Sequence, residues 1–347
     1  MENFKIPAAK TRKTKNKEEH NFMSKRRSKA ATKQLHIFSG SVYPQLASEI
    51  ATYLGVELGD IRLEHFSNSE SYVRYMESIR GEDVFLIQSI SGNVNDALME
   101  LLIMIDAAKR ASAKRIHAVI THYGYARQDR KSAAREPITA KLVADLLQTA
   151  GVHDVTTIDL HQGQIQGFFN VPVNHLTALN LFAEYYRAKD LEDICVVSPD
   201  VGRAKAAKKL SDMLGAELAI MHKGRPKHNV AEITSIIGTV EGKTCIINDD
   251  MIDTAGTICA GMQVLKDKGA KKVYVCATHP VFSGPAFERL DACVADEIVV
   301  ANTIPVPEEH LNGKLKTISV APLFAQAIEN IFSNGSVSML FDPDFAL

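Results

Sequence analysis

Short apolar runs alternate with helical patterns along most of this chain. Residues 83–89 (DVFLIQS) form one such run, residues 96–111 carry apolar side chains at helical spacing, and residues 115–121 (RIHAVIT) form the next run. Parallel strands need a crossover connection, usually a helix, so this alternation predicts an α/β fold with mainly parallel sheets flanked by helices. Further strands are predicted at 154–159, 194–198, 244–248 and 273–278.

The alternation occurs twice, with similar details in each half. Ala113–Ile116 leads to Thr121-His122, and Ala270–Val273 leads to Thr278-His279, each time after a strand and a helix. A chain of 347 residues is long enough for two ordinary domains. We therefore predict two similar α/β domains. The predicted parts are 35–177, 178–327 and a tail, 328–347, that packs back on the first domain.

The first 34 residues differ in character from the rest. They carry a net charge of +8, which leaves −9 for the remainder, and they lack apolar periodicity. These features predict a disordered basic arm, because such a segment cannot bury enough apolar surface to fold. The run Lys25–Lys29 is compatible with an address signal, an RNA-binding patch or a solvated tail. Phe4 and Phe22 are the only aromatic residues of the arm, so we expect no nucleic-acid partner.

Other bulk features exclude further classes of protein. No run of about 18 apolar residues is present, so no membrane span is expected. The five cysteines are an odd number without CxxC spacing, which is typical of reduced thiols. The chain is therefore expected to be a soluble protein of the cytoplasm.

The segment 246–257 (IINDDMIDTAGT) is the most informative in the chain. A strand is expected to stop at Asp249-Asp250, and a loop of small residues then leads into a helix predicted over 258–268. Ligands of parallel sheets bind at the carboxyl ends of the strands, and the free N–H groups of a helix N-terminus favour phosphate. Carboxylates are suitable acceptors for a sugar diol. The predicted ribose 5-phosphate site contains Asp249, Asp250, Asp253, Thr254, Ala255, Gly256 and Thr257.

This segment resembles the phosphoribosyl-binding signature of type I phosphoribosyltransferase folds, which transferases and ribose-phosphate pyrophosphokinases share. Four other stretches distinguish the two: 66–70 (FSNSE), 125–129 (YARQD), 159–169 (DLHQGQIQGFF), and 198–200 (SPD) with 223–226 (KGRP) downstream. In this order they resemble the phosphate-dependent class of ribose-phosphate pyrophosphokinases, over about residues 38–341. The resemblance implies two tandem type I phosphoribosyltransferase-like domains. It also implies transfer of the β,γ-diphosphate of ATP to the C1 hydroxyl of ribose 5-phosphate, which releases AMP.

The resemblance assigns roles to individual residues. Lys223 and Arg225, in a polar stretch typical of a mobile loop, match the catalytic pair, and Arg225 also matches a ribose 5-phosphate contact. Basic side chains suit this reaction, because diphosphoryl transfer depends on charge neutralisation and positioning. His161 and Asp200 match magnesium ligands, and Mg²⁺ usually has few protein ligands. The positions matching ATP contacts are Phe66, Asn68, Ser69, Glu70, Arg127 and Gln128.

Further matches concern assembly and regulation. In the family the loop that contains Phe66 usually enters the active site of a neighbouring subunit, so a dimer-based homo-oligomer is expected, with a hexamer as the expected size. Activation by phosphate and inhibition by ADP are also implied, and arginine and serine side chains suit phosphate oxygens. The positions matching this allosteric site are Ser78, Arg80, Ser112, Arg135, Ser336, Ser338 and Phe341.

One departure from the family pattern lies beside the predicted site. Family members usually have Gly-Gly after Pro-Asp, whereas this chain has Gly202-Arg203. Arg203 adds bulk and charge near the expected magnesium and ribose contacts, and the sequence leaves its effect open.

Alternatives to the leading interpretation remain at this point. The chain could be a phosphoribosyltransferase that consumes the product, or a non-catalytic regulatory paralogue of the synthetase. For the segment 246–257 alone, the alternative is an acidic turn in which Asp253-Thr254 only caps a helix.

Overall fold

The computed structural model describes residues 34–227, 230–311 and 313–341, with the backbone alone within 223–234 and at 339 and 341. Leu35–Leu347 form one compact unit. The predicted arm therefore lies outside the described residues except for Gln34.

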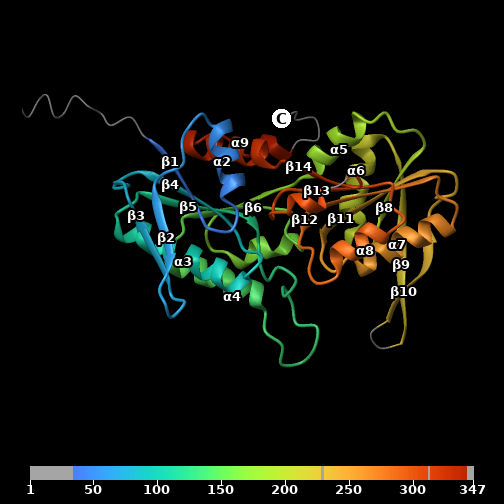
Figure 1. The fold of residues 1–347 in the computed structure, drawn as a ribbon, viewed down its shortest axis with the longest axis horizontal. Helices are drawn as coiled ribbons and strands as arrows, with labels where there is room; N and C mark the ends of the chain where they lie inside the picture. Colours follow the sequence, from blue (N-terminus) through green and yellow to red (C-terminus); the bar gives the residue numbers. More distant parts are fainter. Residues whose placement is uncertain (1–33, 228–229, 312, 342–347) are drawn as a thin grey trace, which may run out of the picture. The chain divides into compact units, whose positions relative to one another are not determined.

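The first sheet has five parallel strands in the order β1-β4-β5-β6-β7 (Figure 1). All seven residues of β4 are buried, as expected for a parallel strand that helices cover on both faces. A separate antiparallel hairpin joins β2 to β3 in the same half of the chain. The bounds of these strands are β1 Leu35–Ser39, β2 Ile61–His65, β3 Ser71–Tyr75, β4 Asp83–Ser89, β5 Arg115–His122, β6 Asp154–Ile158 and β7 Val173–Leu176.

The second sheet has seven strands in the order β10-β9-β8-β11-β12-β13-β14. Neighbouring strands are parallel except for β9 and β10, which are antiparallel. The two expected mainly parallel sheets are thus confirmed. The bounds are β8 Ile194–Ser198, β9 Glu217–Lys227, β10 Val230–Ile237, β11 Thr244–Ile252, β12 Lys272–Pro280, β13 Glu297–Ala301 and β14 Leu315–Ile318.

The backbone at Lys223 and Arg225 forms a strand, and the prediction of a loop there is wrong. Both residues lie in β9, which pairs with β8 only as far as Ile220 and with β10 beyond it. The two strands therefore leave the sheet as a hairpin (Figure 1). The sequence signal for this hairpin is in β10, which is rich in the β-branched residues that favour strands. The stretch around Lys223 is polar and gives no such signal.

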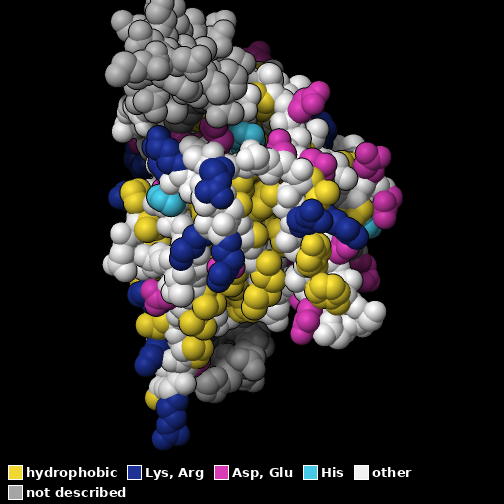
Figure 2. Space-filling view, turned by 90° about the vertical axis from the view of Figure 1, so that its left-hand side faces the viewer, with side chains coloured by type: hydrophobic (Ala, Val, Ile, Leu, Met, Phe, Trp, Pro, Cys, Tyr) yellow, Lys and Arg dark blue, Asp and Glu magenta, His cyan; other side chains and the backbone are white. Residues whose placement is uncertain are grey.

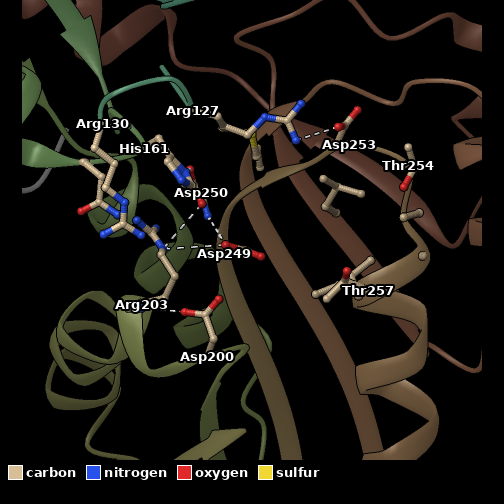
Figure 3. Close-up of a pocket in the computed structure, with 17 residues that line it drawn as sticks. Arg127, Arg130, His161, Asp200, Arg203, Asp249, Asp250, Asp253, Thr254 and Thr257 are labelled. Carbon is tan, nitrogen blue, oxygen red and sulfur yellow. Dashed lines mark hydrogen bonds and ion pairs between the residues drawn. The ribbon is translucent and has the colours of Figure 1, made fainter. Parts of the chain in front are cut away.

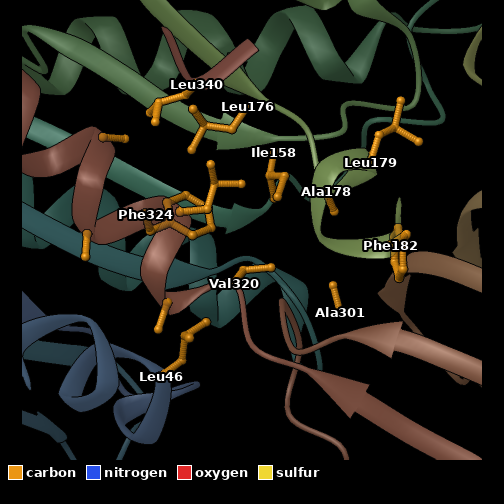
Figure 4. Close-up of a cluster of buried hydrophobic side chains, with 14 of the residues drawn as sticks. Leu46, Ile158, Leu176, Ala178, Leu179, Phe182, Ala301, Val320, Phe324 and Leu340 are labelled. Atoms are coloured by element: carbon orange, nitrogen blue, oxygen red, sulfur yellow. The ribbon is translucent and has the colours of Figure 1, made fainter. Parts of the chain in front are cut away.

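Helices cover both sheets on both faces (Figure 1). The layer containing α2, α5, α6 and α9 packs on one core that extends over both sheets and includes Leu46, Phe182 and Phe324 (Figure 4). The other face has two separate cores, one under α3 and α4 and one under α7 and α8. No helix in the described ranges is both long and apolar enough for a membrane span. The bounds are α2 Pro44–Tyr53, α3 Val94–Arg110, α4 Thr139–Ala150, α5 Leu179–Arg187, α6 Ala204–Leu214, α7 Gly256–Asp267, α8 Ala286–Ala292 and α9 Ala321–Ser333.

The last helix returns to the first half of the chain. α9 follows the second sheet in sequence but packs against α2, which follows β1. Phe324 of α9 and Leu46 of α2 belong to the same buried cluster. The predicted packing of residues 328–347 on the first domain and the predicted domain boundary near residue 177 both stay predictions.

The sequence pattern that occurs in both halves of the chain ends each time in a Thr-His pair, and the two pairs meet where the two sheets adjoin. His122 ends β5 and His279 lies near the end of β12; both rings are buried, and their centroids are 4.6 Å apart. Thr278 donates a hydrogen bond to Oδ2 of Asp159 in the first half at 2.7 Å. The repeated motif therefore places the carboxyl ends of the two strands against each other.

Acid should weaken this junction. Burial, and then the charge of His279, holds the pKa of His122 well below its ordinary value, and burial also lowers the pKa of His279. Below about pH 6.5 the unfolded chain takes up protons on these rings while the folded chain does not, so the free energy of unfolding should fall as the pH drops. The expected slope is up to about 1.4 kcal/mol per pH unit for each ring.

Urea unfolding of the wild type and of His122→Gln between pH 7 and pH 5 tests this prediction. The variant should lose less stability over this range, because it has one ring fewer to protonate in the unfolded state. Equal slopes for the two proteins would contradict it.

Candidate active site

The acid pair lies on β11 itself. The strand was predicted to stop at Asp249, but it continues to Ile252, because Asp249 and Met251 extend the ladder with β12. On the other side, β8 pairs with β11 only as far as Ile247. Asp249 and Asp250 therefore lie beyond the end of β8, in the crevice where ligands of parallel sheets bind. A strand holds them more precisely than the predicted loop would.

Asp250 is only 2% exposed and is held by two basic groups (Figure 3). Its Oδ2 lies 2.7 Å from Nδ1 of His161, and its Oδ1 lies 3.7 Å from Nε of Arg203. Burial alone raises the pKa of Asp250, but the hydrogen bond from His161 and the charge of Arg203 outweigh burial and hold it below its ordinary value. At Asp249, burial and then the charge of Asp250 raise the pKa well above its ordinary value.

The phosphate end of the predicted site is the N-terminus of α7. The helix begins at Gly256, two residues before the predicted start, and Ala255 turns the chain into it with a left-handed φ of 58°. No described side chain caps this helix, so the alternative in which Asp253-Thr254 only caps it is wrong. Asp253 is instead ion-paired with Arg127 at 2.7 Å. The N–H groups of the first turn have no acceptor within the helix.

One cavity of about 500 Å³ contains both ends of this site. His161, Asp200, Arg127 and Arg203 line it, and its size is ordinary for a small-molecule site. Figure 3 shows their side chains converging on this space from several elements. The predicted ribose 5-phosphate residues on its wall are Asp249, Asp250, Asp253, Thr254, Ala255, Gly256 and Thr257.

The predicted ATP residues separate into two groups. Arg127 and Gln128 line an adjoining cavity of about 400 Å³, and Arg127 lines the first cavity as well. The other four, Phe66, Asn68, Ser69 and Glu70, form the turn between β2 and β3 and line neither cavity. The N–H of Glu70 donates to Oδ1 of Asn68 at 3.2 Å, and Phe66 is 55% exposed.

The remaining predicted residues lie away from these cavities or outside the described side chains. Lys223 and Arg225 lie in β9, but their side chains, like that of Phe341, are outside the described part. Arg80 donates to Oγ of Ser112 at 3.1 Å. The six described allosteric positions are all exposed: Ser78, Arg80, Ser112, Arg135, Ser336 and Ser338.

The donors suited to magnesium are Asp200 and His161. Among the described residues, no group of three or more His, Cys, Asp or Glu side chains is arranged to hold a metal ion. Mg²⁺ commonly binds through one or two protein groups and completes its shell with water and substrate phosphates. Since Nδ1 of His161 contacts Asp250, Nε2 is the nitrogen left to face the cavity. These donors fit a magnesium–phosphate complex and do not fit a cage built by the protein alone.

Two basic residues of the cavity were not assigned to it from the sequence. Arg130 lines it from the loop after β5, one residue beyond the recognised 125–129 stretch. Arg203 was noted only as a departure from the family pattern, and it lies over the acid pair. Its charge was visible in the sequence, but its contact with Asp249 depends on β8 and β11 being neighbours.

Known proteins resemble this chain over most of its length. A family model of the N-terminal domain of ribose phosphate pyrophosphokinase matches residues 35–151, and one of the phosphoribosyl synthetase-associated domain matches residues 202–342. The ribose-phosphate pyrophosphokinase of Bacillus caldolyticus is 54% identical over 309 residues, which cover 89% of this chain and 98% of that protein. That of Bacillus subtilis (strain 168) is 53% identical with the same coverage.

A solved structure agrees with these relatives. The crystal structure of phosphoribosylpyrophosphate synthetase from Mycobacterium smegmatis matches with a TM-score of 0.83 and 47% identity, covering 87% of this chain and 100% of that one. The enzyme class and the fold of two tandem type I phosphoribosyltransferase-like domains, both predicted from the motifs, are confirmed. The chain belongs to the ribose-phosphate pyrophosphokinase family.

Proposed function

We propose that this chain transfers the β,γ-diphosphate of ATP to the C1 hydroxyl of ribose 5-phosphate, giving 5-phosphoribosyl 1-diphosphate and AMP for nucleotide biosynthesis. The observation that carries the proposal is a single cavity with an uncapped helix N-terminus and the Asp249-Asp250 pair on its wall. The first feature suits a phosphate and the second suits a vicinal diol, and ribose 5-phosphate has both. We place the reaction in the cytoplasm, a location supported by five free cysteines.

The ATP phosphates are proposed to lie between the two adjoining cavities. Arg127 lines both of them, and its ion pair with Asp253 joins the ATP side to the ribose 5-phosphate loop. In the reaction the C1 oxygen forms a bond to the β-phosphorus of ATP and gives up its hydroxyl proton to solvent. The bond from that phosphorus to AMP breaks, and its electron pair leaves with AMP. Holding the two substrates in line is the main contribution expected of the protein.

Charge neutralisation is assigned to basic side chains and to magnesium. Lys223 and Arg225 are proposed to stabilise the negative charge of the transferring diphosphate from the β9–β10 hairpin. Asp200 and Nε2 of His161 would hold a magnesium ion together with substrate phosphates. When bound, the ion would offset part of the charge on the diphosphate.

The proposed function has a direct test. Purified protein incubated with ATP, ribose 5-phosphate and Mg²⁺ should release AMP in step with 5-phosphoribosyl 1-diphosphate, and omission of ribose 5-phosphate or Mg²⁺ should stop both. No AMP at any phosphate concentration from zero to tens of millimolar would overturn the proposal and favour a regulatory paralogue. Consumption of added 5-phosphoribosyl 1-diphosphate with a nucleobase would favour a phosphoribosyltransferase.

The active form is proposed to be a dimer-based homo-oligomer, with a hexamer as the expected size. The turn that carries Phe66 lines neither cavity of its own chain, which is consistent with a role in a neighbouring site. Hydrophobic side chains gather on the face at the β2–β3 end of the molecule (Figure 2). Contiguous exposed apolar surface usually marks an interface, and Met76, Met99 and Leu142 are about half exposed.

A shared site should allow two inactive variants to rescue each other. Phe66→Ala removes the proposed adenine contact, and Lys223→Ala removes a proposed catalytic group, so each homo-oligomer should be nearly inactive. Co-expressed, they should regain activity, because some sites combine the Phe66 turn of one subunit with the Lys223 of another. The matched control pairs Lys223→Ala with Arg225→Ala, which affect the same hairpin and should not recover. Absence of recovery in the first mixture would contradict a shared site.

Phosphate activation and ADP inhibition are proposed to act through the exposed serine and arginine positions. Arg80 and Ser112 already contact each other, and both are accessible to an anion. Activity that is indifferent to phosphate and to ADP would contradict this regulation while leaving the proposed reaction intact.

A further inference from the structure

Arg203 lies beside the acid pair in the wall of the proposed ribose site. It ends the short 3-10 turn Val201–Arg203 after β8, and its N–H donates to Oδ1 of Asp200 at 3.2 Å. Its side chain is only 17% exposed. It forms part of the wall of the 500 Å³ cavity and also of a neighbouring cavity of about 760 Å³. A basic side chain is therefore fixed between two polar cavities beside the acid pair.

The Nε atom of Arg203 is buried and has no hydrogen-bond partner among the described residues. It points to the acid pair, at 3.8 Å from Oδ1 of Asp249 and 3.7 Å from Oδ1 of Asp250. Both distances exceed those of hydrogen bonds, although both ion pairs are favourable in charge. Buried donors in native proteins are nearly always bonded to protein or to ordered water, so this donor, beside a binding cavity, is available to an oxygen of a ligand or of water.

We propose that Nε of Arg203 donates a hydrogen bond to one hydroxyl oxygen of the ribose diol, and that the same hydroxyl donates to Asp249 or Asp250. The inference rests on the proposed function and identifies a residue that selects its sugar substrate. An oxygen at about 2.8 Å from both the nitrogen and a carboxylate oxygen would bridge the gap of 3.7 or 3.8 Å. Because Nε has almost no exposed surface, the Arg203 side chain must shift to admit this oxygen. The hydroxyl is suited to this place because it both accepts and donates.

This arrangement makes Arg203 a determinant of specificity. A sugar phosphate that lacks the bridging hydroxyl leaves the buried Nε and its facing carboxylate unpaired, so it should bind more weakly. A purely structural role, in which Arg203 only balances the charges of Asp249 and Asp250, has a different consequence. It would change the affinity for every sugar phosphate alike, whichever hydroxyl the ligand carries.

Calorimetric titration of the full-length protein distinguishes these roles. The probes are ribose 5-phosphate, 2-deoxyribose 5-phosphate and 3-deoxyribose 5-phosphate, and the proteins are wild type, Arg203→Gln and Arg203→Lys. Wild type should bind ribose 5-phosphate about tenfold or more tightly than the analogue that lacks the bridging hydroxyl. In Arg203→Gln this ratio should fall at least about fivefold, while the ratio for the other analogue stays the same. The analogue whose penalty disappears identifies the hydroxyl.

The ratio of the affinities for ribose 5-phosphate and for each deoxy analogue tests the role of Arg203, whereas binding of ribose 5-phosphate by the wild type tests the proposed function. Wild type that binds ribose 5-phosphate, together with unchanged ratios for both analogues in Arg203→Gln, would overturn the role of Arg203 alone. Wild type that binds no ribose 5-phosphate would overturn the proposed function and this role with it. If Arg203→Gln does not fold, Arg203→Lys carries the test, because it keeps the charge but not the Nε donor. Its ratio should fall in the same way, and an unchanged ratio would overturn the proposal.

Discussion

Lys223→Ala should reduce turnover by about 10²–10³-fold while changing the affinity for ribose 5-phosphate by less than about threefold. The reason is that diphosphoryl transfer depends on neutralising charge that grows on the diphosphate, whereas the proposed site for ribose 5-phosphate is the α7 N-terminus and the acid pair. Lys223 belongs to the part of β9 that pairs only with β10, outside the sheet that carries those groups. Its removal should therefore leave the sugar site intact.

The measurement is kcat from AMP release, with ribose 5-phosphate affinity from calorimetry on the same preparation. Lys271→Ala is the matched control, because this lysine is exposed at the opposite, amino end of β12 and should keep both values. Lys223→Ala with turnover within about tenfold of the wild type would remove this residue from the catalytic step. A loss of affinity as large as the loss of turnover would instead place it in substrate binding.

Local sequence was sufficient for much of the sheet. The residues predicted for β4 and β8 are those observed, Asp83–Ser89 and Ile194–Ser198, because each is a short apolar run with polar or turn-forming neighbours. The predicted ribose 5-phosphate residues from Asp249 to Thr257 all line one cavity. They are close in sequence, and the strand-to-helix turn alone determines most of their arrangement.

The extents of β9 and β11 and the contacts between the two halves of the chain depend on pairing between distant segments, and local sequence patterns do not predict them. β11 extends through Asp249 because β12 continues beside it, and β9 extends through Lys223 because β10 supplies a partner. The contact of His161 with Asp250 joins residues 89 positions apart, from the first half of the chain to the second. No local periodicity encodes such contacts. Phe66 lines neither cavity of its own chain, and the neighbouring site proposed for its turn would likewise depend on contacts that no local pattern encodes.

The two acids of the pair should respond in opposite ways to the same substitution. Asp250→Asn removes a buried carboxylate that accepts from His161 at 2.7 Å and faces Arg203 at 3.7 Å. Without its charge both basic groups lose their nearest partner, and the free energy of unfolding should fall by about 2 kcal/mol. Asp249→Asn instead removes a charge that burial and the neighbouring Asp250 disfavour, so stability should be unchanged or slightly higher.

The affinity for ribose 5-phosphate should not differ between the two variants in the way that their stability does. Both carboxylates are proposed acceptors for ribose hydroxyls, so each variant should bind ribose 5-phosphate about tenfold or more weakly, because a neutral amide accepts a weaker hydrogen bond. Urea unfolding without ligand and calorimetric titration, at one protein concentration, provide the two measurements. Equal losses of stability in the two variants would contradict the pairing of Asp250 with His161 and Arg203. Equal stability with undiminished affinity would show that the acid pair does not hold the sugar, and the diol would then need another site.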